Sequence, residues 1–111
     1  MKLTLHDHLA YAYTGGKSWK QGQAGVVFVH GALHDHSVWI LQSRYLAHHG
    51  YNVMAVDLPG HGRSAGSALD VPAAGQWLAQ CVDAAGWDRV YWVGHSMGSL
   101  IALEAAGLRA T

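Results

Sequence analysis

Residues 90–98 read VYWVGHSMG, and this stretch decides the fold. It opens with a continuous apolar run, Val90–Val93, whose β-branched and aromatic side chains are typical of a strand in a parallel sheet. An apolar helix is expected to start near Ser96, directly after that strand. Gly94, Ser96 and Gly98 lie between the two as a G-x-S-x-G motif. The stretch therefore predicts a strand, a sharp turn and a helix in immediate succession.

Two more apolar runs lie upstream of this stretch. Val26–Val29 and Val53–Val56 are continuous rather than alternating, as is Val90–Val93. Continuous runs of this kind indicate strands that are buried on both faces. Residues 2–14 alternate loosely and predict two short strands that turn near residues 6–8. The sequence thus predicts three buried strands, preceded by a strand pair at the N-terminus.

Two helices are predicted between the three buried strands. The first covers residues 37–49 and ends at Gly50, a typical helix-terminating residue. The second begins after a capping Asp70, carries Pro72 in its first turn and ends at Gly86. The spacing of the apolar residues predicts the buried face of each helix. In the first helix this face consists of Val38, Leu41 and Tyr45. In the second it consists of Ala74, Leu78, Cys81, Val82 and Ala85.

The alternation of strands and helices predicts an α/β protein with a partial doubly wound parallel sheet. Crossovers between parallel strands are right-handed. If strand 53–56 lies on one side of strand 26–29 and strand 90–93 on the other, this handedness places the two helices on opposite faces of the sheet. A crevice is then expected at the carboxyl ends of strands 26–29 and 90–93. The loops that enter it are residues 30–37 and 94–99.

Composition excludes several classes of protein. The chain has 111 residues, half of them apolar, with seven Lys and Arg against seven Asp and Glu. This balance argues against a nucleic-acid partner and against a polybasic membrane surface. Cys81 is the single cysteine, which excludes a disulfide framework. No apolar stretch is long enough for a signal peptide or a membrane span, so we expect a cytoplasmic globular protein of unknown oligomeric state.

Ser96 is the candidate catalytic residue. A sharp turn between strand and helix would hold its backbone in a strained conformation and raise its hydroxyl above the sheet. Gly94 and Gly98 would leave room for the chain to pass this closely. The N–H of Met97, at the start of the helix, can face an oxyanion. The N–H of Ala32, in the loop after strand 26–29, is the candidate second donor.

Three stretches together resemble the N-terminal half of an α/β-hydrolase: VVFVHGALHDHSVW at residues 26–39, VMAVDLPGHGRSAG at 53–66 and VYWVGHSMGSLIALEAAG at 90–107. The resemblance covers about residues 1–111. It implies that Ser96 matches the nucleophile of the family, and that Ala32 and Met97 match its oxyanion-hole positions. It also implies three central strands that correspond to the third, fourth and fifth of the family's eight.

The resemblance implies a serine hydrolase that acts, in its full-length form, on ester, thioester or related acyl bonds of a small molecule. No cofactor and no metal is expected. Family members that open epoxides or displace halides carry an aspartate at the position of Ser96, so those reactions are disfavoured. A carbon–carbon bond hydrolase or an acyltransferase would use the same half-site. A non-catalytic remnant or binding module with this fold is the alternative from a different class.

The sequence departs from the family after Ser96. The family's catalytic triad continues with an acid and then a histidine, but only fifteen residues follow, with Glu104 and no histidine. Glu104 lies eight residues along the helix, too far up its axis to orient a base. We therefore expect residues 1–111 to be the N-terminal part of a single domain, truncated within the helix. Val90–Val93 would then form an exposed apolar edge.

Several polar residues invite other interpretations. The segments at 6–8 and 34–36 both read His-Asp-His and contain metal-ligand types, but residues this close on one loop seldom supply a full ligand set. We interpret them as surface or loop-packing residues. His30, His34, His36 and His61 all lie in loops at the carboxyl edge, so one of them could approach Ser96. Arg63 could pair with Asp57 or another acid. Cys81 is expected to be buried and inert.

Overall fold

A five-stranded sheet in the order β1-β2-β4-β3-β5 forms the centre of the chain. The computed structural model describes residues 2–5, 8–64 and 68–109. β3 pairs in parallel with β4 on one side and with β5 on the other, and β2 joins β4 in antiparallel orientation. The strands are β1 (Lys2–Leu5), β2 (His8–Tyr13), β3 (Gly25–Val29), β4 (Asn52–Asp57) and β5 (Val90–Gly94). The predicted strand order is confirmed.

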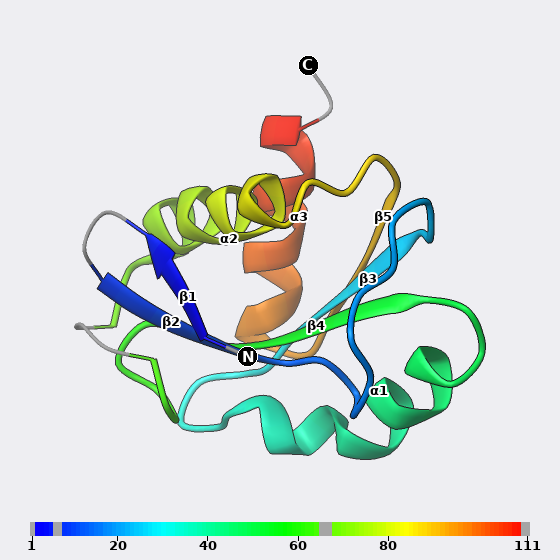
Figure 1. Ribbon diagram of the computed structural model, residues 1–111. Coiled ribbons are helices and arrows are strands. Elements are labelled where there is room, and N and C mark those ends of the chain that lie inside the picture. The colour runs from blue at the N-terminus through cyan, green and yellow to red at the C-terminus, as the bar shows by residue number, and fades with distance from the viewer. Residues whose placement is uncertain (1, 6–7, 65–67, 110–111) are drawn as a thin grey trace.

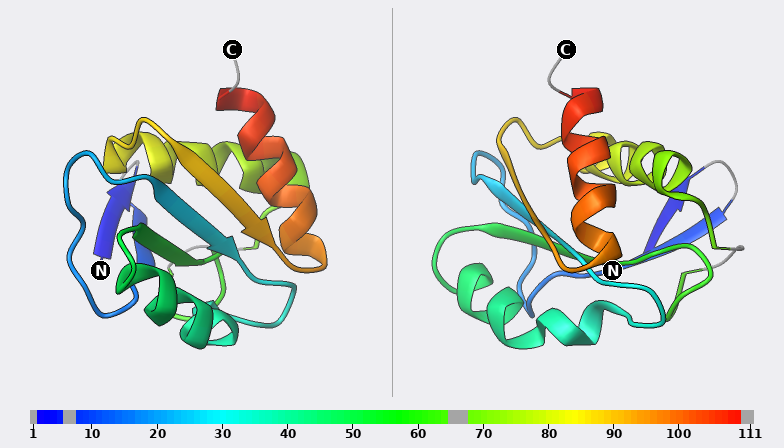
Figure 2. Two further views of the ribbon diagram at one scale, coloured as in Figure 1. Left: turned by 90° about the vertical axis from the view of Figure 1, so that its right-hand side faces the viewer. Right: turned by 180° about the vertical axis from the view of Figure 1, so that it is seen from behind.

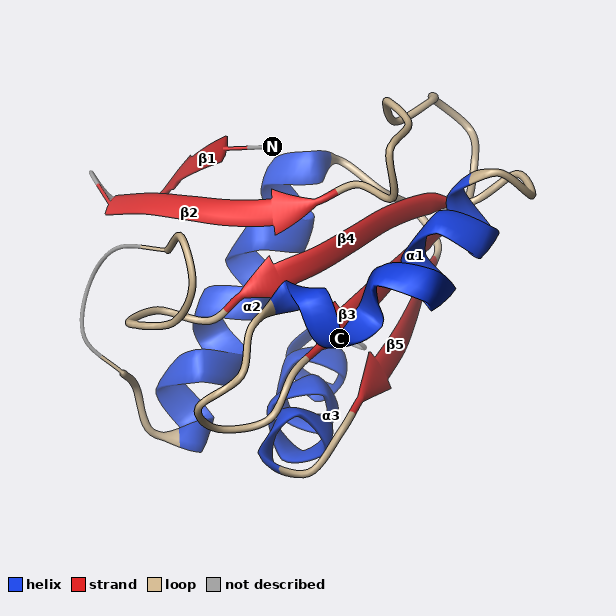
Figure 3. Ribbon diagram, turned by 90° about the horizontal axis from the view of Figure 1, so that it is seen from below, coloured by secondary structure: helices blue, strands red, loops and turns tan. Residues whose placement is uncertain are grey.

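Helices cover both faces of the sheet, as predicted. A 3₁₀ turn, η1 (His36–Trp39), leads into α1 (Ile40–Ala47), which lies on one face. The helices α2 (Val71–Ala85) and α3 (Met97–Arg109) lie together on the other face (Figure 1). Seen from below, α1 crosses in front of the strands, with α2 and α3 behind them (Figure 3). The fold is thus a three-layer α/β arrangement.

The strand β3 supplies side chains to two separate cores. Val27 and Val29 pack into the cluster on the α2 and α3 side, while Val26 and Phe28 pack into the cluster on the α1 side. Successive side chains of a strand point to opposite faces of the sheet, so both sets can be apolar only when both faces are covered. All of β3 and β4 is buried. The continuous apolar runs at these two strands were therefore correctly interpreted.

The helix α2 forms as the sequence predicts. The Asp70 carboxylate accepts a hydrogen bond of 2.9 Å from the N–H of Ala73, which caps the first turn. Gly86 ends the helix in the left-handed conformation, at φ +73°. The predicted apolar face is buried except for Ala85, which is partly exposed. Cys81 lies within that face, and its burial raises the pKa of the thiol to about 12, so the thiol stays protonated.

The predicted buried face of the first helix is wrong. Val38, Leu41 and Tyr45 are 45%, 77% and 62% exposed. The α-helix begins only at Ile40, because a 3₁₀ turn precedes it, and the tighter winding of that turn rotates the helix relative to the predicted face. The side chains that face the core are Trp39, Ser43, Leu46 and Ala47. The helix ends at Ala47, with His48 as its C-cap, and not at Gly50.

The strand β5 lies at one edge of the described sheet. It pairs only with β3 (Figure 2, left). Tyr91 is 54% exposed. Val90, Trp92 and Val93 are half-buried, so the prediction of burial on both faces does not hold for this strand. The edge position expected for β5 is confirmed, but of its four apolar residues only Tyr91 is exposed. None of the helices that the structure describes is long and apolar enough to cross a lipid bilayer.

Candidate active site

Ser96 occupies the turn between β5 and α3, with its backbone in the left-handed region at φ +56°. In residues 2–5, 8–64 and 68–109, only Leu33 shares such a conformation among residues other than glycine. The residue is exposed at the carboxyl end of the sheet. The left-handed conformation costs an L-residue about 1–2 kcal/mol. The strained backbone predicted for Ser96 is therefore confirmed.

Two glycines make this turn possible. A Cβ on Gly94 would lie 2.5 Å from the carbonyl oxygen of Gly98, and a Cβ on Gly98 would overlap the carbonyl oxygens of Val29 and His30. The first turn of α3 therefore packs directly on the backbone at the end of β3. The N–H of His95 donates to the Val29 carbonyl at 3.1 Å and continues the β3–β5 ladder up to the turn. No side chain other than hydrogen would fit at Gly98 without moving β3 and α3 apart.

The loop after β3 lies against Ser96. A Cβ on Gly31 would stand 3.4 Å from the Ser96 Cβ and 3.5 Å from the His34 Cδ2. Gly31 is buried, while Ala32 is exposed, and the N–H of Ala32 makes no hydrogen bond within the described part of the chain. An oxyanion hole requires N–H groups that are free to donate to the substrate oxygen. The structure therefore brings the Ala32 loop and the Ser96–Met97 turn to the same edge of the sheet.

His30 is a buried structural residue. Its Nε2 accepts a hydrogen bond of 3.0 Å from the N–H of Leu58, so the ring proton is on Nδ1, which donates to the Gly31 carbonyl at 2.6 Å. Burial lowers the pKa of His30, because the charged ring would lose its hydration. The neutral ring thus joins the loops after β3 and β4. Both ring nitrogens are engaged, so His30 cannot act as a base for Ser96.

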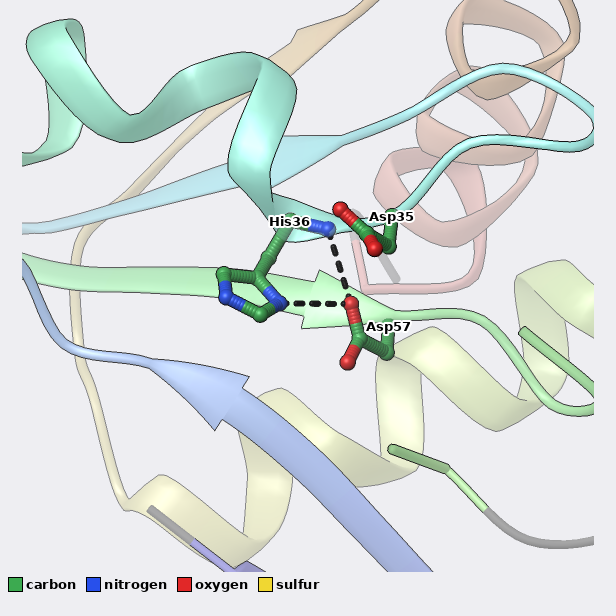
Figure 4. Close-up of side chains that lie close together, drawn as sticks. All are labelled: Asp35, His36 and Asp57. Atoms are coloured by element: carbon green, nitrogen blue, oxygen red, sulfur yellow. Dashed lines mark hydrogen bonds and ion pairs between the residues drawn. The ribbon is translucent and has the colours of Figure 1, made fainter. Parts of the chain in front are cut away.

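Asp57, the last residue of β4, holds the surrounding loops together. Its Oδ1 accepts from the backbone N–H of His36 at 2.7 Å and from the His36 ring Nδ1 at 2.8 Å (Figure 4). Its Oδ2 accepts from the backbone N–H of Arg63 at 2.8 Å. Asp57 is fully buried, so these three donors replace its hydration. Gly62 is required beside it, because a Cβ there would overlap the carboxylate.

The contact predicted between Arg63 and Asp57 forms through the backbone and not through the guanidinium. The Arg63 guanidinium lies 5.1 Å from the centre of the Tyr11 ring. Ser64 connects the end of β4 to β2. Its hydroxyl donates to the Asp57 carbonyl at 2.5 Å and accepts from the N–H of Tyr11 at 2.9 Å. The sequence analysis missed the His36–Asp57 pair. An aspartate that ends a buried strand, opposite a histidine-rich loop, was the available signal.

The ligand-type atoms of Asp35, His36 and Asp57 lie within 4.8 Å of one another. The Asp35 carboxylate accepts from the hydroxyl of Ser37 at 2.5 Å and from its N–H at 2.8 Å, which caps η1. These hydrogen bonds lower the pKa of Asp35. The His36 ring is directed at Asp57 (Figure 4). Capping and pairing contacts therefore account for the cluster. Part of the similar segment at residues 6–8 lies outside the described residues.

A shallow pocket of about 550 Å³ lies between the loops that follow β3 and β4. Leu33, His34 and Asp35 line it from one loop, and Gly60, His61 and Gly62 from the other. A cavity of about 580 Å³ near Trp19 and Trp87 lies at the amino ends of the central strands, at the opposite edge of the sheet. Of these two pockets, the first lies on the same edge of the sheet as Ser96, although Ser96 does not line it.

Comparisons with known proteins agree with this fold. Residues 25–110 match the family model described as alpha/beta hydrolase fold. An (E)-2-((N-methylformamido)methylene)succinate hydrolase of Acinetobacter baylyi is 35% identical over 86 residues, which cover 75% of this chain and 32% of the relative. A pimeloyl-(acyl-carrier protein) methyl ester esterase of Aliivibrio fischeri is 41% identical over 83 residues, which cover 73% of this chain and 30% of the relative.

A solved structure is similar over nearly the whole chain. The crystal structure of epoxide hydrolase A from Mycobacterium thermoresistibile matches with a TM-score of 0.84 at 24% identity, over 99% of this chain and 35% of that one. At that identity the likeness establishes the fold alone. The chain spans about a third of the length of the curated relatives it matches.

Proposed function

This chain belongs to the α/β-hydrolase family, and from that membership we propose that Ser96 is the nucleophile of a hydrolase that cleaves ester, thioester or related acyl bonds. One observation carries the proposal. Ser96 is exposed in a left-handed turn between a strand and a helix, at φ +56°. Strain of this kind is concentrated at functional sites, because the surrounding fold must hold it in place. The curated relatives with hydrolase and esterase names support the class of reaction.

In the proposed reaction the Ser96 Oγ attacks the carbonyl carbon of the substrate and gives its proton to a base. The carbonyl oxygen becomes an oxyanion, which accepts hydrogen bonds from the N–H groups of Ala32 and Met97. Collapse of this intermediate expels the alcohol or thiol and leaves an acyl group on Ser96. Water then attacks the acyl group and releases the acid.

The base and its orienting acid are proposed to lie outside residues 1–111. His30 and His36 are both engaged in hydrogen bonds, to Gly31 and Leu58 and to Asp57. The His61 Nδ1 donates to the Pro59 carbonyl at 3.1 Å. The His34 Cδ2 and the Ser96 Cβ both lie beside Gly31, so turnover that His34→Gln removes would overturn this part of the proposal. Glu104 lies against α2, since its Cβ faces Gly75, and cannot reach the Ser96 turn. We therefore expect residues 1–111 to be acylated slowly and to lack turnover at an enzyme-like rate.

Imidazole can supply the missing base in a test. The chain is mixed with p-nitrophenyl acetate, with and without imidazole. Imidazole itself cleaves this ester, so the rate of p-nitrophenol release in the same solution without protein is subtracted. We expect imidazole to accelerate release by about tenfold or more, the lower end of what a positioned base contributes. Ser96→Ala should abolish this release.

Ser99→Ala is the matched control, because Ser99 is an exposed serine in the first turn of α3, three residues after Ser96. It should leave release unchanged. Release that persists in Ser96→Ala would contradict the proposal, and an unreactive Ser96 would favour the alternative of a non-catalytic binding module.

A further inference from the structure

Leu33 combines two unfavourable features beside the Ser96 turn. Its backbone is left-handed at φ +64°, and its side chain is 94% exposed. The N–H of His34 donates to the Gly31 carbonyl at 3.3 Å and closes a turn in which Leu33 is the third residue. A third turn residue with positive φ is usually glycine or asparagine. The conformation of this turn therefore does not explain why the residue is leucine.

Packing within the chain does not explain the leucine either. A side chain that is 94% exposed makes little contact with the core and gains almost nothing from burial. Glycine at this position would relieve the strain and remove the exposed apolar surface. An apolar side chain held at such a position indicates contact with something that the chain does not itself supply.

The position of Leu33 indicates what that contact is. Leu33 lines the pocket of about 550 Å³ together with His34 and His61. Gly31, two residues earlier, lies against the Cβ of Ser96. An acyl group bound to Ser96, with its oxygen at the N–H of Ala32, would extend from this point along the same loop. The first side chain that follows Ala32 on the loop is that of Leu33.

We propose that Leu33 is a specificity-determining residue that contacts the apolar acyl chain of a substrate bound at Ser96. The inference rests on the proposed function and names a substrate class within it: esters whose acyl group carries an apolar chain of several carbons. Contact with such a chain would cover the exposed leucine. The polar groups of the pocket, His34, Asp35 and His61, would remain hydrated around it.

The test compares two substrates on variants of the same chain. Ser96-dependent p-nitrophenol release is measured with p-nitrophenyl acetate and p-nitrophenyl hexanoate, in the presence of imidazole. We expect the parent chain to prefer hexanoate, and both Leu33→Gly and Leu33→Asn to lower the hexanoate-to-acetate ratio about tenfold. The rate with acetate is the reference for this ratio, because the acetyl group is too short to extend to Leu33. Leu41→Ala, which truncates a leucine 77% exposed on α1, should leave the ratio unchanged.

Thermal unfolding of the same variants separates a substrate contact from a structural one. Glycine and asparagine accept the left-handed conformation, so neither variant should unfold at a lower temperature than the parent. An unchanged ratio in both variants, or a lower unfolding temperature in both, would overturn the role of Leu33 while leaving Ser96 as the nucleophile. Absence of Ser96-dependent release from the parent chain would overturn the proposed function and this inference together.

Discussion

At the scale of single residues, the site depends on positions where the backbone has no freedom. Ser96 can hold its left-handed turn because Gly94 and Gly98 let β5, α3 and the end of β3 approach one another. The motif and its place between a strand and a helix were sufficient to predict this turn. Leu33 could not be predicted, because no sequence rule places leucine at a left-handed position. The left-handed turn at Ser96 can thus be recognised in the sequence because two glycines flank it, whereas no such residues mark the turn at Leu33.

Substitution of the two glycines of α3 tests this view of the turn. Gly98→Ala should lower the free energy of unfolding by about 1–3 kcal/mol, because the added methyl overlaps the Val29 and His30 carbonyls. Gly107→Ala in the same helix meets no atom within 4 Å and should be neutral or stabilise by up to about 1 kcal/mol. Urea unfolding of both variants measures the difference. Equal effects would mean that α3 does not pack on the end of β3.

At the scale of elements, the sequence predicted what is set locally and missed what is set by packing between elements. The limits and buried face of α2 follow from its own cap, glycine and spacing. The face of α1 does not, because Trp39 packs on Phe28, with ring centres 5.1 Å apart, and a 3₁₀ turn precedes the helix. The hydrogen bonds that His30 and Asp57 make to neighbouring loops also join residues far apart in the sequence, so local patterns did not predict them. They hold the loop that carries Ala32 in place.

The buried His30 should make stability depend on pH. Its pKa is lowered in the folded state by burial, from an ordinary value of 6.5. The neutral ring therefore contributes stability that is present above about pH 6.5 and is lost as pH falls through the folded pKa. His30→Gln keeps one donor and one acceptor but does not titrate. Between pH 7 and pH 5, the free energy of unfolding should fall more steeply for the parent than for this variant. Parallel pH profiles would contradict the buried neutral ring.

At the scale of the whole molecule, the order of the three central strands leaves β5 at an edge of the described sheet. The three apolar runs predicted the central strands, and with β3 between β4 and β5, as the structure has it, right-handed crossovers place the helices on both faces. The edge at β5 then leaves one side of an apolar strand without a partner among the described strands, with Tyr91 54% exposed. Unprotected edges of this kind promote pairing between copies.

We therefore expect the 111-residue chain to self-associate or to be only partly folded. Tyr91→Lys adds a charge to the β5 edge and should lower the self-association of the chain, as measured by sedimentation over a range of concentrations. Leu103→Ala, which shortens an exposed side chain on α3, is the control. A compact monomer with one sharp thermal transition, in the parent chain, would contradict this expectation.

The central claim is that Ser96 forms a covalent bond to the acyl group of its substrate. The most direct measurement is the mass of the peptide that contains residues 90–109 after the chain has reacted with p-nitrophenyl hexanoate and imidazole. The account predicts a hexanoyl group on that peptide, which fragmentation assigns to Ser96 and not to Ser99. A hexanoyl group found only on other residues, or equally on the Ser96→Ala variant, would contradict it.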